Sequence, residues 1–135
     1  SIQSQIINLL LDLKESRELA YLFIAHDLSM VRYVSDDVGV MYLGQLVEVC
    51  EADEIYSHPL HPYTKGLLGS IPIANPRLAR EKEKSSIEGD IPSPINPPSG
   101  CRFHTRCPYA KPICSQAVPE FKEAAPGHMV ACHLY

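Results

Sequence analysis

The chain has 135 residues, of which 45% are hydrophobic and 21% charged, and its formal net charge is −4. These values are typical of one soluble domain. The acidic balance argues against a general nucleic-acid binder, which needs a basic surface to neutralise phosphates. We see no apolar run long enough to span a bilayer and no signal peptide, so we expect a cytoplasmic protein whose thiols stay reduced.

Residues 2–25 have the pattern of a helix followed by a strand. Apolar residues recur at a spacing of three and four from Ile2 to about Glu15, which predicts an amphipathic helix packed on a sheet. Residues 21–25 are five apolar or small residues in a row, which predicts a strand buried on both faces of a parallel α/β sheet. Ligands bind outside the carboxyl ends of such strands, so His26, which follows, is either a site residue or a hydrogen-bonded structural histidine.

The middle of the chain predicts short helices around a hairpin. Asp27 can cap a short helix that has Met30, Val31 and Val34 on one face and ends around residues 35–37. Residues 38–43 and 45–49 are β-rich runs separated by Gly44, which predicts a tight hairpin without fixing its turn type. Residues 51–56 can start another helix, and Pro62 suits the first turn of one that continues through residue 68. These elements leave strand edges unpaired, and a complete domain would cover them.

The remaining residues predict a connector and a cysteine-bearing tail. The charged run 77–84 is typical of a solvated helix or loop. The proline-rich run 89–100 predicts an extended, semi-rigid linker. After it comes a small tail that we expect to be irregular.

The tail contains four of the five cysteines, separated by five, six and seventeen residues: Cys101, Cys107, Cys114 and Cys132. Four thiolates in a loop-rich segment favour a stabilising metal centre, and zinc and a four-iron cluster both accept four thiolates. Unligated, reduced cysteines are the alternative. A mixed zinc site could use the nearby histidines His104, His128 or His133. Arg102 and Arg106 either lower the pKa values of the neighbouring thiols or form an ordinary solvated basic patch. Cys50 is most simply a small core residue.

Several stretches together resemble the C-terminal part of the ATP-binding subunit of oligopeptide/dipeptide ABC transporters. They are Ser1-Ile-Gln-Ser-Gln, Phe23-Ile-Ala-His-Asp-Leu, Val40-Met-Tyr-Leu-Gly, His58-Pro-Leu-His-Pro-Tyr-Thr-Lys, Pro92-Ser-Pro-Ile-Asn-Pro-Pro-Ser-Gly-Cys and Phe103-His-Thr-Arg-Cys-Pro. Ala-His-Asp alone is a weak signal, but the order of these segments is highly specific, and the resemblance covers essentially the whole chain.

The resemblance implies a fold, a site and a ligand set. The fold is α/β, the C-terminal part of a P-loop ABC ATPase domain with an incomplete sheet, followed by the linker and the four-cysteine tail. His26 matches the switch histidine that contacts the ATP γ-phosphate, and Asp27 matches its loop-shaping neighbour. Cys101, Cys107, Cys114 and Cys132 match cysteines that ligate a 4Fe-4S cluster in some relatives. The implied divisions are residues 1–70 for the nucleotide-binding part, 71–99 for the linker and 100–135 for the tail.

The resemblance also implies an ATP-hydrolysing subunit on the cytoplasmic face of the membrane that energises peptide import. Its expected partners are a second ATPase subunit, in a homodimer or heterodimer, membrane permease subunits and an extracytoplasmic peptide-binding protein. ATP and Mg²⁺ would be its cofactors, but the sequence has no G-x-x-x-x-G-K-[ST] phosphate loop and no Mg²⁺ ligands of this kind. We therefore expect these residues alone to be inactive. The alternative function is a metal-binding interaction module that stabilises or docks the subunit.

Overall fold

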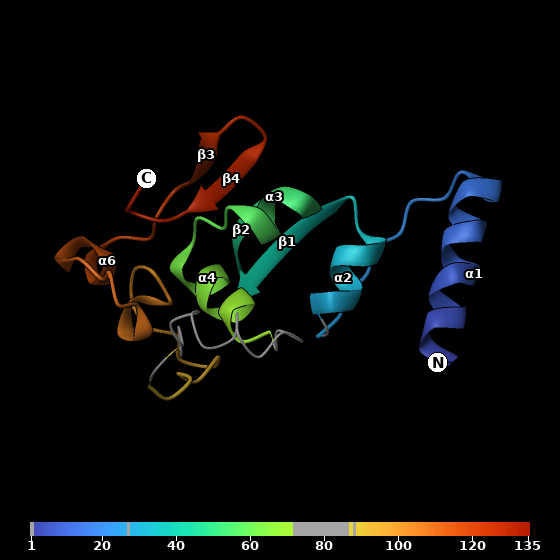
Figure 1. Ribbon diagram of the computed structural model, residues 1–135. Helices are drawn as coiled ribbons and strands as arrows, with labels where there is room; N and C mark the ends of the chain where they lie inside the picture. Colours follow the sequence, from blue (N-terminus) through green and yellow to red (C-terminus); the bar gives the residue numbers. More distant parts are fainter. Residues whose placement is uncertain (1, 27, 72–86, 88) are drawn as a thin grey trace, which may run out of the picture. The chain divides into compact units, whose positions relative to one another are not determined.

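The computed structural model describes residues 2–26, 28–71, 87 and 89–135 (Figure 1). It contains two compact units, residues 1–36 and residues 37–135. The charged run 77–84 and Asp27 lie outside the described residues, so their predicted roles stay predictions.

The first unit contains two helices, α1 (Ile2–Arg17) and α2 (Leu28–Val34). Both were expected from the apolar spacing, and Lys14 and Arg17 lie in the last turn of α1, where positive charge offsets the helix dipole. Lys14 also forms an ion pair with Asp36.

The strand predicted over residues 21–25 is absent, and that prediction is wrong for this structure. These residues have no regular secondary structure, and the side chains of Leu22 and Ile24 are 94% and 86% exposed. A strand forms by pairing with a neighbour, and none of the described strands pairs with this segment. Its apolar sequence favours burial, but the described residues do not supply the surrounding layers.

The second unit is built on a four-stranded antiparallel sheet with the order β1-β2-β4-β3. Its strands are β1 (Asp37–Tyr42), β2 (Gln45–Glu51), β3 (Phe121–Ala125) and β4 (His128–Ala131). The predicted hairpin is therefore confirmed as β1–β2. On the other side of β2, β4 pairs with Glu48 and Val49, so the C-terminal residues extend the sheet (Figure 1). The expectation of an irregular tail is wrong here, because its last part pairs as a hairpin.

Short helices cover and flank this sheet. The helix α3 (Ala52–Ser57) packs on β2 and β1, and α4 (Pro62–Gly69) follows it. Proline at the start of α4 was expected, because its missing N–H has no intrahelical partner there. The cysteine segment adds the 3₁₀ turn η1 (His104–Arg106) and the helix α6 (Pro112–Gln116). Residues 89–100 contain neither helix nor strand, and whether they act as a linker stays a prediction.

The core of the second unit lies between the sheet and these helices. Its buried side chains come from the hairpin, from α3 and from the tail: Val38, Val40, Tyr42, Val47, Cys50, Ile55, Phe103 and Val130. The prediction that Cys50 is a core residue is confirmed, since it is 2% exposed and burial raises the pKa of its thiol to about 12. The tail thus supplies part of the core that the β1–β2 hairpin needs.

The turn between β1 and β2 has two residues, and both have positive φ. Leu43 has φ +45° and Gly44 has φ +78°, as in the type I′ turns that match the twist of a hairpin. Glycine adopts this region freely, whereas leucine is strained there.

Leu43→Asn should stabilise the protein by about 0.5 kcal/mol, because Asn tolerates the left-handed region and prefers the first position of such a turn. The same change at Leu46, which lies in β2, should destabilise by about 0.5–1 kcal/mol because Asn fits strands poorly. Urea unfolding midpoints of the two variants measure both effects. A shift of both midpoints in one direction would contradict the assigned turn.

Candidate functional site

A buried carboxylate lies at the centre of the second unit. Glu48 in β2 is fully buried and accepts three hydrogen bonds. The backbone N–H of Leu60 donates to its Oε1 at 2.6 Å, and that of His61 donates to its Oε2 at 3.0 Å. Nε2 of His128 in β4 donates to Oε1 at 2.7 Å. A charge without water needs such partners, so Glu48 joins β2, β4 and the loop before α4.

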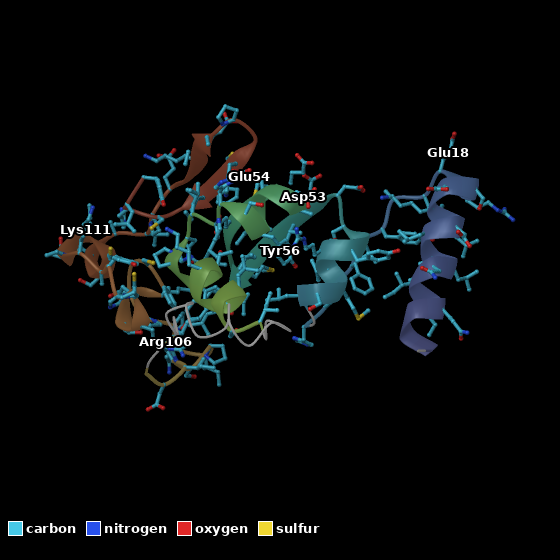
Figure 2. The ribbon with its side chains drawn as sticks, in the orientation of Figure 1. Glu18, Asp53, Glu54, Tyr56, Arg106 and Lys111 are labelled. Atoms are coloured by element: carbon cyan, nitrogen blue, oxygen red, sulfur yellow. The ribbon has the colours of Figure 1, made fainter. Side chains whose placement is uncertain are left out.

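His128 lies between two carboxylates. It is 2% exposed, and its Nδ1 is 3.9 Å from Oε1 of Glu54. Figure 2 shows Glu54 on α3, where its Oε2 lies 3.3 Å from Nδ1 of the exposed His58. The cluster of Glu48, Glu54 and His128 therefore connects α3 to both central strands.

His61 starts α4 and lies in an aromatic cluster. Its Nδ1 accepts the N–H of Tyr63 at 3.0 Å, which caps the helix. Its ring is 5.8 Å from that of Phe103, which also packs against Tyr42 and Tyr63. Burial lowers the pKa of His61 from 6.5 to about 4; Glu48 partly opposes this and Lys65 adds to it. His61 is therefore neutral at pH 7, as its acceptor role requires.

The four tail cysteines influence one another and are all free thiols. Burial raises the pKa values of Cys101, Cys107 and Cys132, and the charges of neighbouring tail thiolates raise them further. Cys114 takes part in all three interactions, so the structure gathers the four cysteines in one neighbourhood. In Figure 2 sulfur atoms lie in the orange segment near Lys111, at the start of α6.

Backbone amides point at all four sulfur atoms. The N–H groups of Phe103, Tyr109 and Leu134 each donate to the cysteine two residues earlier and oppose the rise in its pKa. The N–H of Lys111 lies 3.4 Å from Sγ of Cys114. Such donors stabilise negative charge on sulfur, which suits thiolate ligands.

The cysteines do not form a metal site in the positions found. Among the residues that the structure describes, no group of three or more His, Cys, Asp or Glu side chains has metal-binding geometry. The three histidines considered for a mixed site have other partners. Nδ1 of His104 lies 2.8 Å from the carbonyl of Cys101 and Nε2 of His133 lies 2.9 Å from that of Ala117, while His128 binds Glu48.

The expectation that Arg102 and Arg106 lower thiol pKa values is wrong. Arg102 donates to the carbonyl of Leu43, in the β1–β2 turn, and Arg106 donates to that of Ile87 at 3.3 Å. Neither guanidinium is among the causes of the thiol shifts, and burial dominates those shifts.

His26 belongs to the first unit and lies just before α2. Its side chain is exposed, so its ring is accessible. The sequence reasoning missed the connection of Glu48, His61 and His128. One signal was present: Glu48 is a charged residue in the middle of the β-rich run Leu46-Val-Glu-Val-Cys, where a central strand should be apolar.

The His-Pro loop and the first three tail cysteines lie within a stretch that matches a known protein family. Residues 47–114 match the family described as "Oligopeptide/dipeptide transporter, C-terminal region", so the chain is of the peptide-transporter class. The chain belongs to this family, which confirms the resemblance.

Curated relatives match over nearly the whole chain. The oligopeptide transport ATP-binding protein AppF of Bacillus subtilis is 58% identical over all 135 residues, and the putative oligopeptide transport ATP-binding protein YkfD of the same organism is 54% identical over 135. OppF of Salmonella typhimurium is 52% identical over 132 residues, 98% of this chain. The chain spans 41%, 41% and 39% of their lengths. Within the described ranges, no helix is long and apolar enough to cross a membrane.

The low pKa of His61 predicts a loss of stability in acid. The unfolded chain binds a proton there near pH 6.5, but the folded protein does so only near pH 4. The stabilising effect of the neutral ring is complete above pH 6.5 and is lost as the pH falls through 4, with a loss on the order of 3 kcal/mol. His61→Asn keeps a capping acceptor without the titration, so urea unfolding from pH 7 to 4 should show a smaller decline. Equal declines in both proteins would contradict this role.

Proposed function

We propose that the chain forms part of the ATP-hydrolysing subunit that energises import of oligopeptides or dipeptides. The observation that carries this proposal is the 58% identity, over all 135 residues, to an oligopeptide transport ATP-binding protein. The expected partners follow from the same proposal: a second ATPase subunit, membrane permease subunits and an extracytoplasmic peptide-binding protein. The subunit would lie at the cytoplasmic face of the membrane.

His26 would contribute one contact to the nucleotide site. An imidazole can donate a hydrogen bond to a phosphate oxygen, and phosphoryl transfer depends mainly on positioning and charge stabilisation. The exposed side chain of His26 is available for such a contact. Asp27 would shape the loop beside it. The phosphate-cradling amides, the lysine and the Mg²⁺ ligands would come from the rest of the longer subunit, so we expect no ATP turnover from these 135 residues alone.

In the complete transporter, His26→Ala should lower ATP turnover by about 100-fold or more, since it removes a contact to the transferred phosphate. Binding of a non-hydrolysable ATP analogue should change much less. His58→Ala makes the same change at a histidine whose side chain is 73% exposed in the other unit, and it serves as the control. Near-normal ATP turnover by the His26→Ala transporter would contradict the proposed contact of His26 with the phosphate.

A second proposal concerns Cys101, Cys107, Cys114 and Cys132. We propose that they hold a 4Fe-4S cluster or zinc, which would stabilise the tail or help it dock. Support comes from the chemistry of the donor set, four neighbouring free thiols whose sulfur atoms face backbone N–H groups. Because the described residues lack metal-binding geometry, the sulfur atoms would have to draw together on binding.

Metal analysis after anaerobic purification tests this proposal. Iron with sulfide would indicate the cluster, and one zinc per chain a structural zinc site. Cys107→Ser should lower the bound metal at least several-fold, whereas Cys50→Ala should not, since Cys50 lies in the core. Metal affinity should fall as the pH falls, because thiols with raised pKa values must lose protons to bind. Wild-type protein that contains no metal after anaerobic purification would contradict the proposed metal site.

A further inference from the structure

The C-terminal residues 128–135, here called the C-terminal strap, reach the loop of residues 58–62 at two points. His128 does so through Glu48, whose carboxylate also holds the amides of Leu60 and His61. Tyr135 does so directly, since its Oη donates to the carbonyl of Leu60 at 3.3 Å. The strap and the loop are separated by more than sixty residues of sequence, so these contacts are tertiary.

The loop depends on Glu48 for its backbone hydrogen bonds. Pro59 and Pro62 have no N–H, and the N–H of His58 donates to the backbone carbonyl of Glu54 in α3. The two remaining amides, those of Leu60 and His61, both donate to Glu48. Whatever holds the Glu48 carboxylate in place therefore holds the entire loop, and with it the start of α4.

The strap is also attached to the cysteine segment. Cys132 is buried and lies between the two loop contacts in sequence, near enough to the other three tail cysteines for their charges to influence one another. The next residue, His133, lies 2.9 Å from the carbonyl of Ala117 through its Nε2. The strap is thus fixed to the cysteine segment in its middle and to Glu48 and Leu60 at its two ends.

We propose that the C-terminal strap couples the position of Cys132 among the four tail cysteines to the order of the loop 58–62 and of the start of α4. Withdrawal of Cys132 from the group loosens the strap, His128 releases Glu48, and the Leu60 and His61 amides lose a fixed acceptor. His128 and Tyr135 are positioning residues in this device. It goes beyond the proposed function, because it needs neither ATP nor a bound metal.

Amide hydrogen exchange on the 135-residue chain, measured by mass spectrometry and NMR at pH 7, tests the strap. Cys132→Ser should speed exchange of the Leu60 and His61 amides at least 10-fold while the β1 amides that pair with β2 keep their protection. Cys50→Ala is the matched control, since Cys50 is a buried cysteine in the same strand as Glu48 but outside the tail group. Its exchange at Leu60 and His61 should stay at the wild-type rate.

Substitutions of His128 and Tyr135 distinguish an effect carried by the strap from a general loss of stability in the second unit. His128→Gln keeps an N–H donor for Glu48 and should retain more protection at Leu60 and His61 than His128→Ala. Tyr135→Phe removes one hydroxyl and should speed exchange in the loop about three-fold without affecting β1. Unchanged exchange at Leu60 and His61 in Cys132→Ser overturns the proposal, as does equal acceleration in β1 and in the loop. Either result leaves the ATPase proposal standing, and failure of His26→Ala to lower turnover leaves the strap standing.

Discussion

The second unit depends on one buried charge. Glu48 lies where its strand is paired on both sides, opposite Val40 in β1 and Val130 in β4. Removal of one hydrogen-bond partner of a buried carboxylate costs on the order of 1–3 kcal/mol or more, because the carboxylate has lost its water and then lacks a donor in its place. The carboxylate therefore contributes mainly by fixing the arrangement of its neighbours, because Leu60, His61 and His128 must all be in position to donate to it.

That requirement explains why the His-Pro-Leu-His-Pro sequence forms a defined loop. Prolines limit the backbone and remove donors, and the amides that remain find their acceptor on β2. The same sequence then places His61 as the cap of α4 and brings its ring against Phe103 of the cysteine segment. The His-Pro loop and the C-terminal strand β4 are in this way both joined to β2.

The two units differ in how much of their apolar surface their own residues bury. The hairpin obtains a third strand, β4, and an aromatic core from the tail. In the first unit, Ile6, Leu9, Leu22 and Ile24 remain largely exposed. The chain spans about two fifths of the length of its relatives.

The sequence alone determined the local elements and the family. Helical spacing, Gly44 between two β-rich runs and Pro62 at a helix start are local signals, so α1, the β1–β2 hairpin and α4 were predictable, as was the membership indicated by the His-Pro and cysteine segments. Only the tertiary structure decided which distant residues meet. Residues 21–25 do not form a strand, because a strand needs a neighbour to pair with. Glu48 and His128, eighty residues apart in the sequence, are joined by a hydrogen bond. The tertiary structure also raised the thiol pKa values through burial, and it directed the guanidinium groups of Arg102 and Arg106 to backbone carbonyls. Pairing, burial and side-chain direction depend on residues far apart in the chain, and local sequence patterns do not contain them.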